Sequence, residues 1–184
     1  PRRQRQMCIR DRNGRAGSPL VDGDIVIIRG VTSYWGANGP ARDRFFGFDK
    51  NTGEHLWTSV PGVGPPYLKD TSMSTPFLET RDGKRVFYAG TGCGNIVWVN
   101  VNDGTAIWRW QVSKGGINSS PVVYKDSVIN IHGKENLDTT EMGRMFRIKI
   151  PEDFDAIDGE VDPIQKGARR LSEDIEVWRE TLEM

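Results

Sequence analysis

Few residues of this chain have the types and spacing that acid–base or binding chemistry requires. His132, Lys134 and Glu135 follow an apolar segment, and Asn118 lies in the loop before Pro121. An imidazole beside an ammonium and a carboxylate is suited to proton transfer, and functional side chains gather on the loops that follow strands. We take Asn118, His132 and Lys134 as candidate cofactor-binding residues and assign no catalytic residue. The alternative is that His132 merely caps the end of a strand.

Metal and thiol chemistry have weaker support in the sequence. The segment 153–162 is acidic, but a solvated loop explains it more simply than a calcium site does. No spacing of His, Cys, Asp or Glu is typical of a zinc site or an EF-hand, so we predict no metal. Cys93 lies in the glycine-rich stretch 90–94, and we interpret it as a small side chain beside a turn. No Ser-His-Asp grouping, Walker loop or Rossmann fingerprint is present.

A repeated block ending in tryptophan organises the chain. Residues 47–57 and 98–108 form the two clear copies, and their final tryptophans, Trp57 and Trp108, are 51 residues apart. A Ser-Pro or Thr-Pro pair also recurs, at 18–19, 75–76 and 120–121. Repeats of roughly 40 to 50 residues, built from short strands and glycine-containing turns, are typical of a β-propeller. We therefore predict an all-β fold, a partial β-propeller of about three four-stranded antiparallel blades.

Strand and turn patterns within each repeat support this prediction. In the segment 96–101, Ile96 and Trp98 share one face and the valines share the other, as expected of a strand between two neighbouring sheets. Asp103-Gly104 predicts a hairpin turn after it. The helical spacing within 164–182 is weak, and we predict a strand at 176–179 that supplies the tryptophan of the third repeat.

The predicted blades cover almost the whole chain. They span about residues 17–62, 72–115 and 118–184, and the third contains an insertion at about 151–174.

These blocks resemble the pyrroloquinoline-quinone-type (quinoprotein-like) propeller repeat, which is found in quinoprotein alcohol dehydrogenases and in outer-membrane assembly lipoproteins. The pattern of that family is Ala-x-Asp-x-x-Thr-Gly-Lys-x-x-Trp, its tryptophan-docking motif, and its tryptophan packs between adjacent blades. The first copy keeps the Asp, Thr, Gly and Trp, the second keeps the Gly and Trp, and the third is opened by the insertion. The resemblance implies a structural docking role for Asp49, Thr52, Gly53, Trp57, Gly104, Trp108 and Trp178.

The two ends of the chain carry separate expectations. Closed propellers have about 4–8 blades, so we expect the remaining blades to lie outside this chain and residues 13–184 to associate through uncovered faces. Residues 1–12 contain five arginines and resemble translated sequencing-adapter read-through of the kind seen in assembled metagenomic reads, the alternative being a native basic arm. Without them, 20 basic and 24 acidic residues remain. No basic stripe interleaved with aromatics is left, which argues against nucleic-acid binding.

The resemblance implies two functions. The one we favour is a non-catalytic scaffold in the periplasm or cell envelope of a Gram-negative-type bacterium, without a cofactor, binding protein or glycan partners through the loops 32–43 and 60–73. The alternative is a fragment of an alcohol or sugar dehydrogenase that uses pyrroloquinoline quinone and calcium. The quinone and calcium ligands of that family cannot be matched to residues here. A propeller attached to a signalling enzyme is a third option. The sequence has no run of 18 or more apolar residues and predicts no transmembrane segment.

Overall fold

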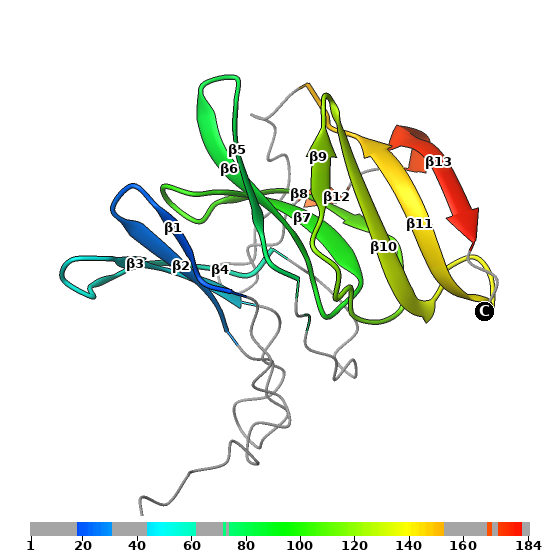
Figure 1. Ribbon diagram of the computed structural model, residues 1–184, viewed down its shortest axis with the longest axis horizontal. Coiled ribbons are helices and arrows are strands. Elements are labelled where there is room, and N and C mark those ends of the chain that lie inside the picture. The colour runs from blue at the N-terminus through cyan, green and yellow to red at the C-terminus, as the bar shows by residue number, and fades with distance from the viewer. Residues whose placement is uncertain are drawn as a thin grey trace, which may run out of the picture.

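A computed structural model of the chain describes residues 18–30, 44–61, 72, 74–152, 169–170 and 173–181. The regular structure in these ranges consists of strands and one short 3-10 turn, arranged as three neighbouring sheets (Figure 1). The predicted all-β architecture of about three antiparallel blades is therefore confirmed. The predictions for residues 1–12, for most of the loops 32–43 and 60–73, and for the acidic segment 153–162 lie outside the described residues.

Each sheet is a meander of four antiparallel strands. The first contains β1 (Leu20–Asp22), β2 (Ile25–Gly30), β3 (Arg44–Asp49) and β4 (His55–Ser59). The second contains β5 (Phe77–Arg81), β6 (Lys84–Gly90), β7 (Asn95–Asn100) and β8 (Ala106–Gln111). The third contains β9 (Val122–Tyr124), β10 (Ser127–Glu135), β11 (Met142–Lys149) and β13 (Glu176–Thr181).

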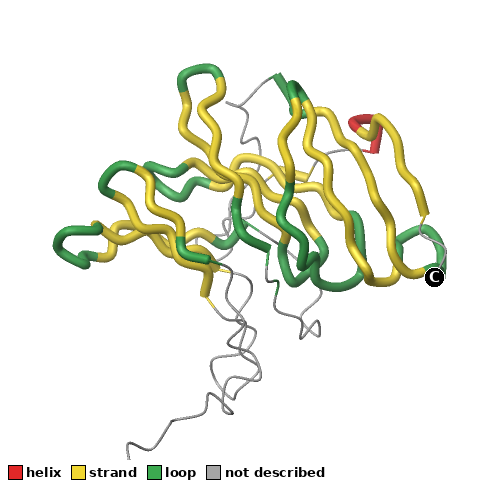
Figure 2. The backbone as a smooth tube through the Cα atoms, in the orientation of Figure 1, coloured by secondary structure: helices red, strands yellow, loops and turns green. Residues whose placement is uncertain are grey.

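Two short elements supplement these blades. The strand β12 (Arg169–Arg170) pairs in parallel with β8 at the outer edge of the second blade, which the repeat pattern does not predict. A 3-10 turn, η2 (Glu173–Ile175), leads directly into β13. The tube view in Figure 2 shows that the turns joining β1 to β2, β5 to β6 and β9 to β10 all point to the same side of the molecule. The three blades thus have the same orientation along the chain.

The outer strand of every blade carries a tryptophan at the same place in the ladder. The cross-strand pairs are Gly47–Trp57, Trp98–Trp108 and Arg147–Trp178. In all three blades the register shifts by one residue immediately after this pair. Trp178 therefore occupies the same position as the other two tryptophans, although a much longer segment separates it from its partner strand.

The middle blade has an apolar layer on each face. Ile96 and Trp98 of β7 pack in the cluster between the second and third blades, whereas Val97 and Val99 pack in the cluster between the first and second. All four side chains are fully buried. This two-sided burial is the one predicted for the segment 96–101, and it makes β7 the centre of the described core.

The turn that follows the third strand is built alike in the first two blades. The Asp49 carboxylate accepts hydrogen bonds from the backbone amides of Asn51 and Thr52, both at 2.8 Å. These bonds hold the pKa of Asp49 below its ordinary value. In the second blade the side-chain oxygen of Asn100 accepts from the amide of Asn102 at 2.9 Å. An amide oxygen thus replaces the carboxylate as the acceptor.

Glycines make room for Trp57 between the first two blades. A Cβ atom on Gly47 would lie 2.2 Å from Trp57 Cε2, and one on Gly104 of the next blade would lie 2.5 Å from Trp57 Cε3. Gly104 also has a φ of 70°, which glycine adopts without strain. The indole therefore lies against the backbone of both blades, and any side chain at either glycine would displace it.

Candidate functional site

A cavity of about 270 Å³ lies where the connection from β8 to β9 meets the end of β10. Its lining residues are Gly116, Asn118, Ser119, Ile131, His132, Gly133 and Lys134. The three residues proposed from the sequence as cofactor-binding candidates, Asn118, His132 and Lys134, are thus brought together at one site. Asn118, Ile131 and Gly133 are exposed, so the cavity opens to solvent.

The position of His132 differs from the one expected. The sequence places it just past an apolar strand, whereas β10 continues to Glu135 and holds His132 inside the ladder, opposite Arg144. Alternation along β10 buries Val128, Asn130 and His132 on the face toward the second blade, and His132 is only 3% exposed. His132 is therefore a buried strand residue and not the exposed cap of a strand end.

A β-bulge follows His132. His132 pairs with Arg144 and Glu135 with Met142, so β10 advances by three residues while β11 advances by two. An extra residue of this kind bends the strand and redirects its side chains, and bulges are frequent beside functional sites. Gly133 and Lys134 lie within this irregular stretch, and both line the cavity.

The hydrogen bonds of His132 define its protonation. The backbone amide of Lys134 donates to His132 Nδ1 at 3.3 Å, so Nδ1 is the unprotonated nitrogen. Burial, reinforced by the positive charge of Arg144, lowers the pKa of His132 to about 4. The ring is therefore neutral at pH 7 and carries its proton on Nε2. That nitrogen is buried and has no hydrogen-bond partner among the described residues.

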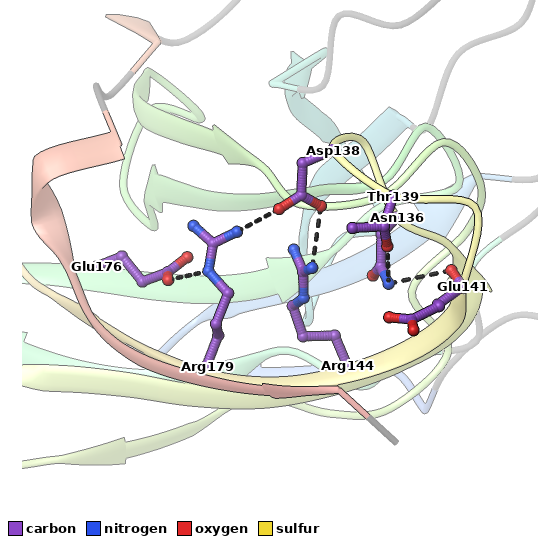
Figure 3. Close-up of polar contacts among 7 residues, drawn as sticks. All are labelled: Asn136, Asp138, Thr139, Glu141, Arg144, Glu176 and Arg179. Carbon is purple, nitrogen blue, oxygen red and sulfur yellow. Dashed lines mark hydrogen bonds and ion pairs between the residues drawn. The ribbon is translucent and has the colours of Figure 1, made fainter. Parts of the chain in front are cut away.

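Arg144, the cross-strand neighbour of His132, belongs to an ion-pair network. Figure 3 shows this network. Asp138 pairs with Arg144 at 2.9 Å through one carboxylate oxygen and with Arg179 at 2.6 Å through the other. Arg179 also pairs with Glu176 at the start of β13. Partial burial alone would raise the pKa of Asp138, but the hydrogen bond from Arg144 and the charges of both arginines outweigh it and lower that pKa. The network ties the long connection between β10 and β11 to the outer strand.

Ser119 also lines the cavity and is held by contacts to β10. Its hydroxyl contacts the side-chain oxygen of Asn130 and the backbone oxygen of Ile131. Asn130 Nδ2 in turn donates to the backbone oxygen of Ser119 at 3.4 Å. These contacts attach the connection from β8 to β9 to β10, so the segments that line the cavity are held together.

The predicted docking residues lie away from this cavity. Those of the first two repeats lie at the end of β3, in the turns after β3 and β7, and on β4 and β8: Asp49, Thr52, Gly53, Trp57, Gly104 and Trp108. Trp57 and Trp108 are buried, at 6% and 4% exposure, and Trp178 on β13 is half-buried. None of these residues lines the cavity.

Sequence reasoning missed Ser119 and Arg144. Ser119 directly precedes the third Ser-Pro pair, and Arg144 alternates with Phe146 on the buried face of β11. A charged residue on the buried face of a strand was the signal that could have identified Arg144, since buried charges need a partner.

No group of three or more His, Cys, Asp or Glu residues within the described ranges is arranged to hold a metal ion. Cys93 is half-buried, with its sulfur 3.2 Å from Thr91 Oγ1 and 3.1 Å from Asn95 Nδ2. In the part of the chain that the structure describes, no helix has the length and apolarity needed to cross a membrane.

Known structures share this architecture. BamB from Moraxella catarrhalis is 19% identical over 72% of this chain and 32% of that chain, with a TM-score of 0.48. A europium-containing methanol dehydrogenase is 19% identical over 92% of this chain and 26% of that chain, with a TM-score of 0.51. A quinohemoprotein alcohol dehydrogenase from Comamonas testosteroni is 14% identical over 90% and 20%, with a TM-score of 0.47. The chain thus spans about a third or less of each of these proteins.

A family model provides the assignment. No curated protein matches the chain. The model described as outer membrane protein assembly factor BamB matches residues 9–151, well over half of the chain. The protein therefore belongs to the pyrroloquinoline-quinone-type β-propeller family, in the group represented by that assembly factor.

Proposed function

We propose that the protein is a non-catalytic propeller scaffold that binds a protein partner in the periplasm or cell envelope. The observation that carries this proposal is the state of His132 in the cavity. A neutral ring with a pKa of about 4, bonded through Nδ1 to a backbone amide, is a poor proton acceptor at pH 7 and a good hydrogen-bond donor. Such a site suits the recognition of a polar group.

The family of the chain supports the same proposal and indicates where the protein would act. The matching model is described as an outer membrane protein assembly factor, and we propose that this chain takes part in such assembly. The cavity lies on connections between strands, where a rigid propeller presents binding residues.

A quinone-dependent dehydrogenase is the second candidate, favoured by the methanol dehydrogenase that covers 92% of this chain. Lys134 and Asn118 could contact the acidic groups of a quinone. Calcium, however, requires several oxygen ligands, the residues that line the cavity include no carboxylate, and the described residues form no cluster of three or more His, Cys, Asp or Glu that could hold a metal ion. The donor set therefore does not fit the quinone–calcium pair, and we derive no reaction step from it.

Site-specific photo-crosslinking in the cell envelope tests the scaffold role. A photoreactive residue replaces Asn118 at the cavity and, as a matched control, Lys149, which is exposed on the other face of the third blade. We expect position 118, but not 149, to crosslink to a component of the outer-membrane assembly machinery identified by mass spectrometry. Equal crosslinking at both positions would contradict the proposal.

A second measurement separates the two candidates. The purified protein is titrated with pyrroloquinoline quinone plus calcium while its melting temperature and dye-linked alcohol oxidation are followed. The scaffold proposal expects neither stabilisation nor turnover. Stabilisation together with turnover would replace it with the dehydrogenase.

A further inference from the structure

We propose that copies of this chain associate head to tail, with the end face of the third blade of one copy packed on the end face of the first blade of the next. An end face is the side of the first or third blade that points away from the second. The inference goes beyond the proposed function and does not depend on it. It rests on an interface that the chain contains twice, between its first and second blades and between its second and third.

The end face of the third blade follows from alternation along β11. Phe146 and Ile148 pack in the cluster shared with the second blade, so Met145 and Arg147, which alternate with them, point away from it. Directly opposed residues of an antiparallel pair lie on the same face. The ladder pairs therefore add the other members of this face: Val122, Ile129, Ile131 and Trp178.

The matching side of the second blade is buried. Counted from the tryptophan pairs that the ladders share, Ile96 of the second blade corresponds to Met145 of the third. Ile96 is fully buried in the cluster between these blades, whereas Met145 is 36% exposed. Trp108 of the second blade is likewise buried, and Trp178 is half-buried. The third blade thus leaves partly exposed the side that the second blade buries.

The end face of the first blade is defined in the same way. Ile27 and Phe45 pack in the cluster shared with the second blade, so Val26, Ile28 and Phe46 point to the opposite side. Ile28 is 36% exposed, and Val26 and Phe46 are half-buried. The ladder pairs add the other members of this face: Val21, Phe48, His55 and Thr58.

Aromatic rings form the centre of this second end face. The ring centroids of Phe48 and His55 are 5.5 Å apart, and that of Phe46 lies 6.4 Å from Phe48 and 6.2 Å from His55. Phe46 and Phe48 correspond to Val97 and Val99 of the second blade, which are fully buried against the first blade. Packing against another apolar face would remove these rings from water and stabilise the contact.

A specific contact makes the first blade the partner of the third. Trp57 of the first blade lies against Gly104, in the turn after β7 of the second. Gly53 holds the same place in the turn after β3, with a φ of 74° against 70° for Gly104. In both turns the glycine amide donates to the backbone oxygen four residues earlier, at 2.9 and 3.0 Å. A Cβ on Gly53 would meet no atom within 4 Å, so head-to-tail packing can place Trp178 of one copy on Gly53 of the next.

The two end faces of one copy cannot meet each other. Figure 1 shows the first and third blades on opposite sides of the second. Contact between unlike faces of neighbouring copies is heterologous, and such contacts produce either a closed ring or an open row of copies. Two copies joined at both pairs of end faces contain six blades, which is within the range of about 4–8 for closed propellers. We therefore expect a dimer.

Sedimentation velocity of the full chain over a range of concentrations tests the association. We expect a species of two copies that dissociates on dilution. A chain that remains monomeric at every concentration would overturn the proposal and leave the end faces to another partner, such as a further blade of a longer protein.

Two charge substitutions test the pairing of unlike faces. Met145→Lys on the third blade and Ile28→Lys on the first should each weaken self-association at least about tenfold, because each buries an ammonium in an apolar contact. An equal mixture of the two variants should form a one-to-one dimer, since each retains the face that the other has lost. Leu137→Lys is the control, because Leu137 is similarly exposed, at 40%, but belongs to neither face. It should stay within about twofold of the parent.

Two outcomes of this experiment would overturn the proposal. One is self-association of either face variant as strong as that of the parent. The other is a mixture that stays monomeric at high concentration.

A pair of glycine variants tests the contact with Trp178. Gly53 and Gly83 share a φ of 74° and an open space around an added Cβ, and Asn tolerates this backbone region. Gly53→Asn should weaken association about tenfold, because its side chain would occupy the place of the indole. Gly83→Asn, in the turn between β5 and β6, should stay within about twofold of the parent. Equal affinities of the two variants would overturn the proposal.

Melting curves show whether each variant is folded. If a face variant does not fold, crosslinking decides the matter. A photoreactive residue is placed at position 145, and isotope-labelled and unlabelled copies are mixed. We expect adducts that join the two kinds of copy and map to β2 and β3. Adducts that map to the third blade of the other copy would show like faces in contact and overturn the proposal.

Discussion

The β6–β7 hairpin of the second blade and the β10–β11 hairpin of the third occupy the same place in consecutive blades. Their ladders begin with the equivalent pairs Val86–Asn100 and Ser127–Lys149. Counting along both strands from these pairs matches Thr91 and Asn95 of the second blade with His132 and Arg144 of the third. The two hairpins can therefore be compared at equivalent backbone positions that carry different side chains.

In the second blade, Thr91 and Asn95 are joined by hydrogen bonds across the short β6–β7 turn. The backbone amide of Thr91 donates to the backbone oxygen of Asn95 at 2.8 Å, and the backbone amide of Asn95 donates to Thr91 Oγ1 at 2.9 Å. In the third blade a longer connection separates His132 from Arg144, and the charge of Arg144 is balanced by Asp138. The hydroxyl of Thr91 thus closes the β6–β7 hairpin with short-range hydrogen bonds, whereas the residue at the equivalent position of the third blade, His132, borders a cavity.

Replacing one glycine in each hairpin should give the largest contrast. Gly94 has a φ of 78°, and a Cβ there would lie 2.0 Å from the backbone oxygen of Ser113. We expect Gly94→Ala to cost about 3 kcal/mol of unfolding free energy or more. Gly133 has no atom within 4 Å of an added Cβ, so Gly133→Ala should change stability by less than about 0.5 kcal/mol. Denaturant unfolding followed by tryptophan fluorescence measures both.

The comparison would fail if the two glycine variants lost similar stability. That result would mean that the β10–β11 hairpin is as tightly packed against its neighbours as the β6–β7 hairpin, and that Gly133 does not border an open space.

The pH dependence of stability should be the next largest effect. The folded-state pKa of His132 is about 4, below the 6.5 of an unperturbed histidine. Between these pH values the unfolded chain binds more protons than the folded chain. The contribution of His132 to the free energy of unfolding is therefore fully present above about pH 6.5 and is lost as the pH is lowered toward 4. A shift of this size corresponds to about 3 kcal/mol. Urea unfolding at a series of pH values measures it. Thr91, at the matching position, has no such titration.

A matched pair of histidine variants isolates the effect. His132→Asn should flatten the stability profile between pH 6.5 and 4. His55→Asn should leave it unchanged, because His55 is exposed and contacts Thr58 on the surface of β4. A profile that stays steep in His132→Asn would assign the dependence to other groups.

Local patterns predicted most of the fold. The two apolar faces of β7, the Asp103-Gly104 turn and the strand containing Trp178 follow from side-chain alternation and turn chemistry within a few residues. These features need no knowledge of the rest of the chain.

The candidate site was only partly predictable, because its features depend on contacts between distant segments. Where β10 ends is decided by pairing with β11 and by the Arg144–Asp138 ion pair, neither of which alternation within 128–131 reveals. The sequence indicated Asn118, His132 and Lys134, but only the packing of consecutive blades places them around one cavity.

The smallest effect tests why His132 differs from its counterpart Thr91. Arg144→Met keeps much of the side-chain volume but removes the positive charge beside the ring, so the pKa of His132 should rise from about 4 toward its ordinary value, by less than the part of the shift that burial causes. NMR titration of the His132 ring protons measures this change. Arg179→Met is the control, because Arg179 pairs with the other oxygen of Asp138 and its charge is not among the causes of the His132 shift. A rise only in Arg144→Met would show that the ion-paired arginine helps to keep the ring neutral. No rise in either variant would attribute the neutral ring to burial alone, and the two hairpins would then differ in depth and not in charge.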